Sequence, residues 1–130
     1  MSKKPDFTHL HVHTEFSLAD STIRVPEKPD HADPKKAKQA NLLSRAVELG
    51  MPALAVTDRN NLFALVKFYK AAEGVGIKPI AGADVMVAEG NEAPWPVTLL
   101  CRDREGYLSL SRVLSRAWLE GHRTDGVAID

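Results

Sequence analysis

The sequence predicts an α/β protein in which parallel strands are joined by helices that pack on the outside. Three observations support this fold class. Short apolar runs of strand length alternate with longer segments whose apolar residues recur at helical spacing, and glycines and prolines separate the two kinds. The 130 residues, 44% of them hydrophobic, suffice for one core. Such alternation favours helical crossovers between parallel strands, but it does not distinguish an open sheet from a barrel.

Four segments have the length and composition of strands. The second is a nearly continuous apolar run, which is typical of a strand buried on both faces. The third contains Gly82, which indicates a bulge or the close approach of another backbone. The predicted strands are residues 7–12, 53–57, 79–87 and 95–101.

Three segments repeat apolar residues with the period of a helix. Pro34 suits the opening turn of the first, and Gly50 suits its end. Asn61 is a candidate N-cap for the second. Residues 15–33 carry charges and prolines without a period and are predicted to form a loop. The predicted helices are residues 35–49, 62–72 and 107–118.

Composition excludes several classes of function. The 17 basic and 17 acidic residues cancel, so no global positive field favours direct binding to nucleic acid. Cys101 is the single cysteine, which excludes an internal disulfide and favours a reducing cytosol. No segment approaches the roughly 18 consecutive apolar residues of a membrane span. We therefore expect a cytoplasmic protein without a membrane partner.

Side chains that bind divalent metals follow the first three predicted strands. In parallel α/β folds, functional residues gather at the carboxyl ends of the strands. The imidazoles of His11 and His13 share one face because they are two residues apart on a strand. Carboxylates at the ends of the same region complete a set of nitrogen and oxygen donors suited to hard or borderline metals. The candidate ligands are His11, His13, Asp20, Asp58 and Asp84.

A purely structural interpretation competes with this one after the second strand. Asp58 is followed by Arg59, Asn60 and Asn61, and aspartate and asparagine are common where a loop enters a helix. Spacing alone leaves both interpretations open.

Four sequence blocks resemble the PHP (polymerase and histidinol phosphatase) domain family. They are His-Leu-His-Val-His-Thr from residue 9, Glu-Phe-Ser-Leu-Ala-Asp from residue 15, Leu-Gly-Met-Pro-Ala-Leu-Ala-Val-Thr-Asp from residue 49, and Gly-Ile-Lys-Pro-Ile-Ala-Gly-Ala-Asp from residue 76. Their occurrence in this order is far more specific than a single His-x-His motif. The resemblance runs from about residue 7 to about residue 118, and it is closest to the PHP domains at the N-termini of bacterial replicative DNA polymerases.

The resemblance implies a distorted seven-stranded (β/α) barrel, with residues 1–130 as the N-terminal part of a single, incomplete domain. It also implies a trinuclear metal cleft in the hydrolytic members. His11 and His13 match the first paired ligands, and Asp20 matches a further ligand position. Active members carry a Thr-Asp-His block after the second strand, where this chain has Arg59. After the third strand they usually carry a glutamate, where this chain has the shorter Asp84.

The resemblance therefore implies a scaffold in DNA replication with a degenerate metal site. The implied partners are the proofreading exonuclease and other replicase subunits, with DNA contacted only through the rest of a parent polymerase that uses magnesium elsewhere. Arg59 has no lone pair and cannot replace an imidazole, which leaves at most one weakly bound zinc or manganese ion. The alternative is a metal-dependent phosphoesterase or exonuclease, which would need a histidine at position 59 and the family's later ligands.

Overall fold

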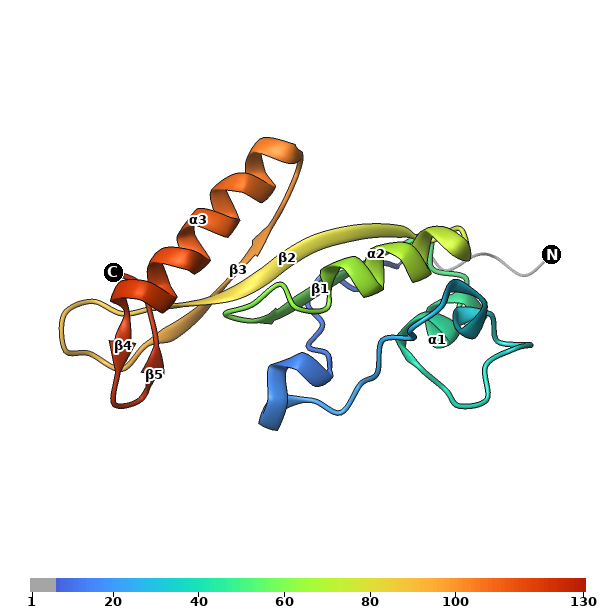
Figure 1. The fold of residues 1–130 in the computed structure, drawn as a ribbon, viewed down its shortest axis with the longest axis horizontal. Helices are drawn as coiled ribbons and strands as arrows, with labels where there is room; N and C mark the ends of the chain where they lie inside the picture. Colours follow the sequence, from blue (N-terminus) through green and yellow to red (C-terminus); the bar gives the residue numbers. More distant parts are fainter. Residues whose placement is uncertain (1–6) are drawn as a thin grey trace.

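A three-stranded sheet runs through the middle of the molecule, with helices packed along it (Figure 1). The computed structural model describes residues 7–130. The strands of this sheet are β1 (Ala53–Arg59), β2 (Lys78–Val87) and β3 (Trp95–Leu100), and the α-helices are α1 (Leu42–Glu48), α2 (Leu65–Gly74) and α3 (Arg104–Glu120). Two 3-10 helices, η1 (Glu15–Asp20) and η2 (Pro29–Ala32), precede them, and a small hairpin of β4 (His122–Arg123) and β5 (Gly126–Val127) follows. The predicted α/β class is confirmed.

The sheet is mixed, with the order β1-β2-β3. β1 and β2 are parallel, as expected for strands joined by α2, whereas β2 and β3 are antiparallel. The prediction of parallel strands throughout is therefore wrong for β3. The reason is the length of the connection, because residues 88–94 are too few for the crossover of a dozen or more residues that a parallel neighbour requires.

The predicted strand at residues 7–12 lies beside β1 but is not a regular strand. The carbonyl of His9 accepts a hydrogen bond from the Ala55 N–H (3.0 Å), and the carbonyl of Val12 accepts one from the Thr57 N–H (2.8 Å). The three-residue interval from His9 to Val12 thus lies opposite the two-residue interval from Ala55 to Thr57. This extra residue interrupts the ladder in the manner of a β-bulge.

The helices differ from prediction mainly at their beginnings. α1 starts seven residues later than predicted because Asn41 forms a capping box, in which its side chain accepts from the Leu43 and Ser44 N–H groups. Asn61 does not cap α2, since its side chain instead accepts from the Phe63 N–H in the turn before the helix. The predicted loop at residues 15–33 contains η1 and η2, which are too short to show a helical period.

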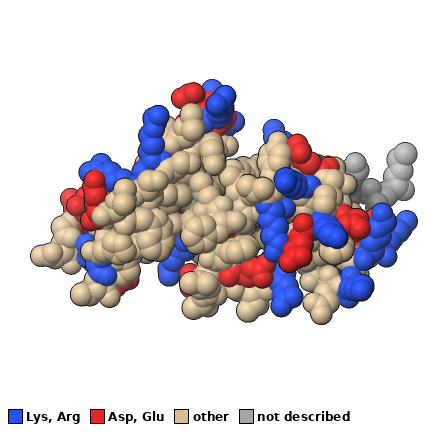
Figure 2. All heavy atoms as spheres, viewed as in Figure 1, with Lys and Arg blue, Asp and Glu red and all other residues tan. Residues whose placement is uncertain are grey.

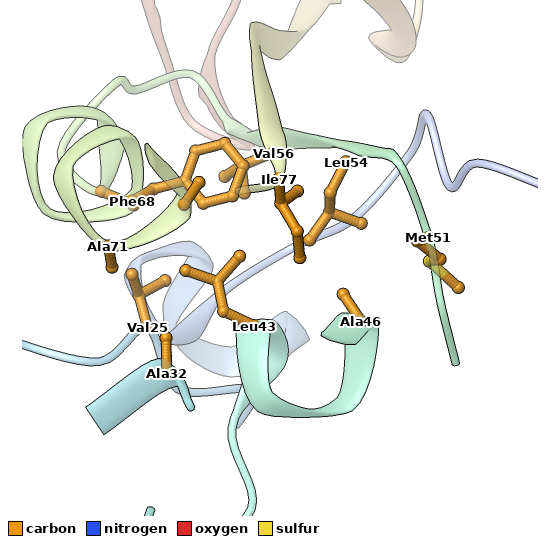
Figure 3. Close-up of a cluster of buried hydrophobic side chains, with 12 residues drawn as sticks. Val25, Ala32, Leu43, Ala46, Met51, Leu54, Val56, Phe68, Ala71 and Ile77 are labelled. Carbon is orange, nitrogen blue, oxygen red and sulfur yellow. The ribbon is translucent and has the colours of Figure 1, made fainter. Parts of the chain in front are cut away.

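Helices cover one face of the sheet, and the opposite face carries Asp84 and Thr98 together with apolar residues such as Ile80 and Met86. In one hydrophobic cluster, Phe68 of α2 packs with Val56 of β1 and Leu43 of α1 (Figure 3). In a second cluster, Val85 of β2 packs with Leu110 of α3. Because side chains alternate along a strand and registered neighbours share a face, Val56 and Val85 lie on the same side of the sheet. Asp84 lies on the opposite side.

The surface agrees with the neutral net charge. On the face shown in Figure 2, Lys and Arg side chains are interspersed with Asp and Glu side chains. None of the helices within residues 7–130 combines the length and the apolar character that a membrane crossing requires.

Candidate metal centre

Two histidines and one aspartate meet on the face of the sheet opposite the helices. The Nε2 atoms of His11 and His13 lie 2.6 Å and 2.5 Å from the same oxygen, Oδ2 of Asp84. The two rings stand edge to face, with their centroids 5.3 Å apart. One ligand atom from each residue can be chosen so that all three lie within 4.8 Å of one another. The i, i+2 spacing of the histidines therefore does bring both imidazoles to one carboxylate.

Thr57 holds the segment that carries the histidines against β1. Its buried hydroxyl accepts a hydrogen bond from the Val12 N–H (3.0 Å) and donates one to the Val12 carbonyl (3.3 Å). On the other side, the Ser21 hydroxyl donates to the carbonyl of His13 (2.8 Å). These contacts fix the backbone on both sides of the imidazoles even though the segment lacks a regular ladder.

Asp84 is supported from β3. Its side chain is almost fully buried, and its second oxygen, Oδ1, accepts a hydrogen bond from the Thr98 hydroxyl (2.6 Å). Burial is the largest single influence on the pKa of Asp84 and raises it. The hydrogen bonds from Thr98, His11 and His13, with the positive charge of His11, together outweigh burial and hold the pKa below its usual range. The carboxylate is thus kept in its charged, ligand-competent form.

Asp58 faces away from these three residues. It is adjacent to Arg59, whose registered partner is Asp84, so the alternation of side chains places Asp58 on the other face of β1. There its carboxylate accepts hydrogen bonds from the Thr14 N–H (2.6 Å), the Thr14 hydroxyl (2.7 Å) and the Ser17 hydroxyl (2.7 Å). With 1% of its surface exposed, Asp58 anchors η1 to the end of β1.

Asp20 also lies outside the group, because it pairs with Arg59. The guanidinium of Arg59 is 3.3 Å from the Asp20 carboxylate, and both side chains are partly exposed. Arg59 is paired in register with Asp84, so its side chain leaves the sheet on the same face as Asp84. Of the five predicted ligands, the structure brings together His11, His13 and Asp84.

The histidines border an open cleft of about 880 Å³. Asp20 and apolar side chains such as Leu42 and Leu54 also line this cleft. The two histidines are therefore accessible to solutes from this side.

Sequence reasoning missed Thr98. The signal was a single hydroxyl in an otherwise apolar strand, Trp-Pro-Val-Thr-Leu-Leu. A hydroxyl at such a position is a candidate partner for a polar side chain on its own face of the sheet. The partner could not be identified without knowing that β3 runs antiparallel to β2 and sets Thr98 opposite Asp84.

The donor set fits one metal ion. Two imidazole nitrogens and one carboxylate oxygen are the ligands of open three-residue sites for zinc, and they also suit manganese. The three donors already converge, so a single ion could take the place of the hydrogen bonds between them. Asp58 and Asp20 are engaged by other protein groups and add no further converging donor.

Two solved structures share this fold. The chain matches an amidohydrolase from Chromobacterium violaceum at 21% identity and a TM-score of 0.50, covering 88% of this chain and 37% of that one. It matches a protein from Bifidobacterium adolescentis, described as a metal-dependent phosphoesterase, at 16% identity and a TM-score of 0.50, covering 92% of this chain and 36% of that one. At these identities the likeness concerns the fold.

Sequence comparison shows more similar proteins. The chain is 77% identical over 120 residues to the DNA polymerase III subunit alpha of Xylella fastidiosa (strain 9a5c), covering 92% of this chain and 10% of that protein. It is 46% identical over 127 residues to the subunit of Pseudomonas aeruginosa and 41% identical over 130 residues to that of Escherichia coli K12, covering 95% and 98% of this chain. The chain thus spans about 10% of the length of each of these relatives. The model of the PHP domain matches residues 9–129, so the chain belongs to the PHP domain family.

Proposed function

We propose that this chain is the N-terminal part of the PHP domain of a bacterial DNA polymerase III alpha subunit and serves there as a scaffold in the replicase. The observation that carries the proposal is the 77% identity to the Xylella fastidiosa subunit over 92% of the chain. Residues 1–130 then form one incomplete domain, and the polymerase activity, with its magnesium, belongs to other parts of the parent protein. The parent acts in the cytoplasm, where the chromosome is copied.

The proposed partners are the proofreading exonuclease and other replicase subunits. The balanced charge of the chain supports contacts with proteins rather than with the DNA backbone, which a strongly basic surface would attract. DNA is then contacted through the rest of the parent chain.

The metal site of this scaffold is reduced to a single weak site at His11, His13 and Asp84. Arg59 supports this reduction, because a guanidinium is always charged and offers no lone pair to an ion. The Arg59 guanidinium lies 3.3 Å from the Asp20 carboxylate and offsets part of the carboxylate repulsion that metal ions would otherwise relieve. Because both side chains are partly exposed, this pair contributes at most about 1 kcal/mol. Asp58 has its oxygens committed to Thr14 and Ser17.

The test of the scaffold role is a deletion in the intact parent subunit. Removing residues 1–130 should abolish capture of the purified exonuclease subunit, whereas the double variant His11→Ala, His13→Ala should retain it. Capture unchanged by the deletion would show that the scaffold role is wrong. Loss of capture in the double variant would show that the metal centre, rather than the scaffold surface, holds the partner.

The convergence of His11, His13 and Asp84 favours one alternative, a metal-dependent phosphoesterase. A zinc or manganese ion bound there would supply Lewis-acid polarisation of a phosphoryl oxygen. This alternative predicts phosphodiester cleavage by the intact parent subunit that disappears in His11→Ala. Our proposal predicts no cleavage that depends on His11.

A further inference from the structure

Thr98 contacts the candidate metal centre from the edge of the sheet. In the antiparallel pair of β2 and β3 it lies directly opposite Asp84, so both side chains are on the same face. The Thr98 hydroxyl donates a hydrogen bond of 2.6 Å to Oδ1 of Asp84. His11 and His13 both contact the other oxygen, Oδ2. The two oxygens of one carboxylate therefore have separate partners.

This separation needs a cause, because a carboxylate rotates easily about its last torsion. That torsion has a broad, two-fold preference, so both oxygens are equivalent in a free aspartate. Asp84 is 2% exposed, which leaves the protein groups to decide its orientation. Threonine is branched at Cβ and restricted at χ1, so its hydroxyl is presented from a fixed position on the strand. Thr98 thereby removes the rotational freedom of the Asp84 carboxylate.

Gly82 allows β3 to come close enough for this contact. It lies two residues before Asp84 on the same face of β2. A Cβ atom at this position would lie 2.6 Å from the backbone oxygen of Leu99 and 2.9 Å from Cδ2 of Leu100. Both values are below the closest approach that Cβ atoms show, so a side chain here would push β3 away. The glycine thus keeps Thr98 within hydrogen-bonding reach.

We propose that Thr98 is a positioning residue that fixes Asp84 as a one-oxygen ligand, with Oδ2 facing His11 and His13. The inference rests on the proposed single-ion site. Hydrogen-bonding partners of ligating carboxylates typically change metal affinity by about 10- to 100-fold when they are removed. Without the Thr98 hydroxyl, Asp84 can turn and present both oxygens to an ion or rotate away from the histidines.

The experiment measures binding of Co²⁺ and Zn²⁺ to the intact parent subunit. Co²⁺ titration gives the visible spectrum of the bound ion, and competition with Zn²⁺ gives the affinity for zinc. Each measurement is corrected by subtracting the result for the double variant His11→Ala, His13→Ala, which lacks the site. Thr98→Val keeps the shape and removes the hydroxyl, whereas Thr98→Ser keeps the hydroxyl. Thr22→Val is the control, because it removes a threonine hydroxyl from the cleft that the two histidines border and leaves the contacts of Asp84 unchanged.

We expect Thr98→Val to weaken Zn²⁺ binding by about 10- to 100-fold and to change the Co²⁺ spectrum as the coordination of Asp84 changes. Thr98→Ser should restore both, and Thr22→Val should leave both unchanged. A wild-type affinity and spectrum in Thr98→Val would overturn the role of Thr98 while leaving the metal site in place. Equal losses in Thr98→Val and Thr98→Ser would also overturn it. A wild-type protein indistinguishable from the double histidine variant would overturn the metal site and, with it, the role of Thr98.

Discussion

The backbone N–H of Asn60 donates a hydrogen bond to the carbonyl of Asp84, over 2.8 Å. Asn60 adopts a left-handed conformation with φ of 54°, which ends β1 and turns its side chain toward β2. There the Asn60 side chain accepts from the Met86 N–H and donates to the Val127 carbonyl, and its own carbonyl accepts from the Trp118 indole. One residue thus connects the backbone of the candidate ligand to β5 and α3.

We predict that Asn60→Ala lowers the local stability of the segments that Asn60 connects more than Asn60→Gly does. Both variants lose two buried hydrogen bonds of the side chain, which costs about 2–4 kcal/mol of local stability. Alanine also pays about 1–2 kcal/mol for the left-handed conformation, whereas glycine adopts it freely at a smaller entropic cost. Amide hydrogen exchange of the segments around Met86 and Val127, in the intact protein, measures the difference. Equal protection in wild type and Asn60→Ala would contradict the prediction.

Asp58 is predicted to matter for stability in the absence of any metal. Asp58→Ala leaves the Thr14 N–H, the Thr14 hydroxyl and the Ser17 hydroxyl without their buried acceptor. Because each buried donor left without an acceptor costs about 1–3 kcal/mol and three donors are affected, we expect a loss of about 3 kcal/mol or more in the free energy of opening η1. Hydrogen exchange in chelator-treated protein provides the measurement.

The control for Asp58 is Asp20→Ala, which removes a partly exposed carboxylate from its ion pair with Arg59. Such pairs contribute at most about 1 kcal/mol, so this variant should change exchange little. If Asp58→Ala behaved like Asp20→Ala unless zinc were added, Asp58 would be a ligand rather than an anchor.

The elements were predictable from sequence where periodicity and length decide them. β1, β2 and α3 were expected at their positions because each is a long, uniform pattern. The direction of β3 depends on the short connection 88–94, and the irregular pairing of residues 7–14 depends on one extra residue opposite β1. The length of the connection is visible in the sequence, so the antiparallel direction of β3 could have been predicted from it. The extra residue does not change the hydrophobic pattern of its segment, so local sequence could not reveal it.

The candidate site was predictable in its residue types and only partly in its geometry. The proximity of His11 and His13 was predictable, because side chains two residues apart on an extended chain point to the same face. Asp58 stands one residue from the position that faces Asp84, and a shift of one residue moves a side chain to the other face of a sheet. Whether Asp58 or Arg59 faces the centre is set by register between two strands, which the sequence of either strand does not contain.

Arg59 provides a gain-of-binding prediction. Arg59→His places an imidazole on the face that carries Asp84 and removes the guanidinium that pairs with Asp20. Because three converging donors become four and one carboxylate is released, we expect Zn²⁺ to bind at least about tenfold more tightly, by the gain of one ligand. Zn²⁺ competition measured on the intact protein tests this.

The matched control for Arg59→His is Arg59→Gln, which removes the same charge without adding a strong nitrogen ligand. Tighter binding in both variants would assign the effect to charge alone. Unchanged binding in Arg59→His would mean that position 59 does not reach the centre.

The last prediction concerns the thiol of Cys101, which follows β3. Burial raises the pKa of this thiol above its ordinary value, and the negative charge of Asp103 raises it further. The thiolate is the reactive form, so Cys101 should alkylate more slowly near pH 7.5 than an unperturbed cysteine, and its rate should keep rising above pH 9. Asp103→Asn removes the charge while keeping a side-chain acceptor for the Gly106 N–H at the beginning of α3. Its rate profile should therefore move to lower pH without returning to that of a free thiol, because burial persists.

Mass spectrometry of the Cys101 peptide after timed iodoacetamide exposure measures the rate at each pH, with Glu105→Gln in the same helical turn as the charge control. A profile for Asp103→Asn that coincides with wild type, or a shift of equal size in Glu105→Gln, would show that Asp103 does not control this thiol.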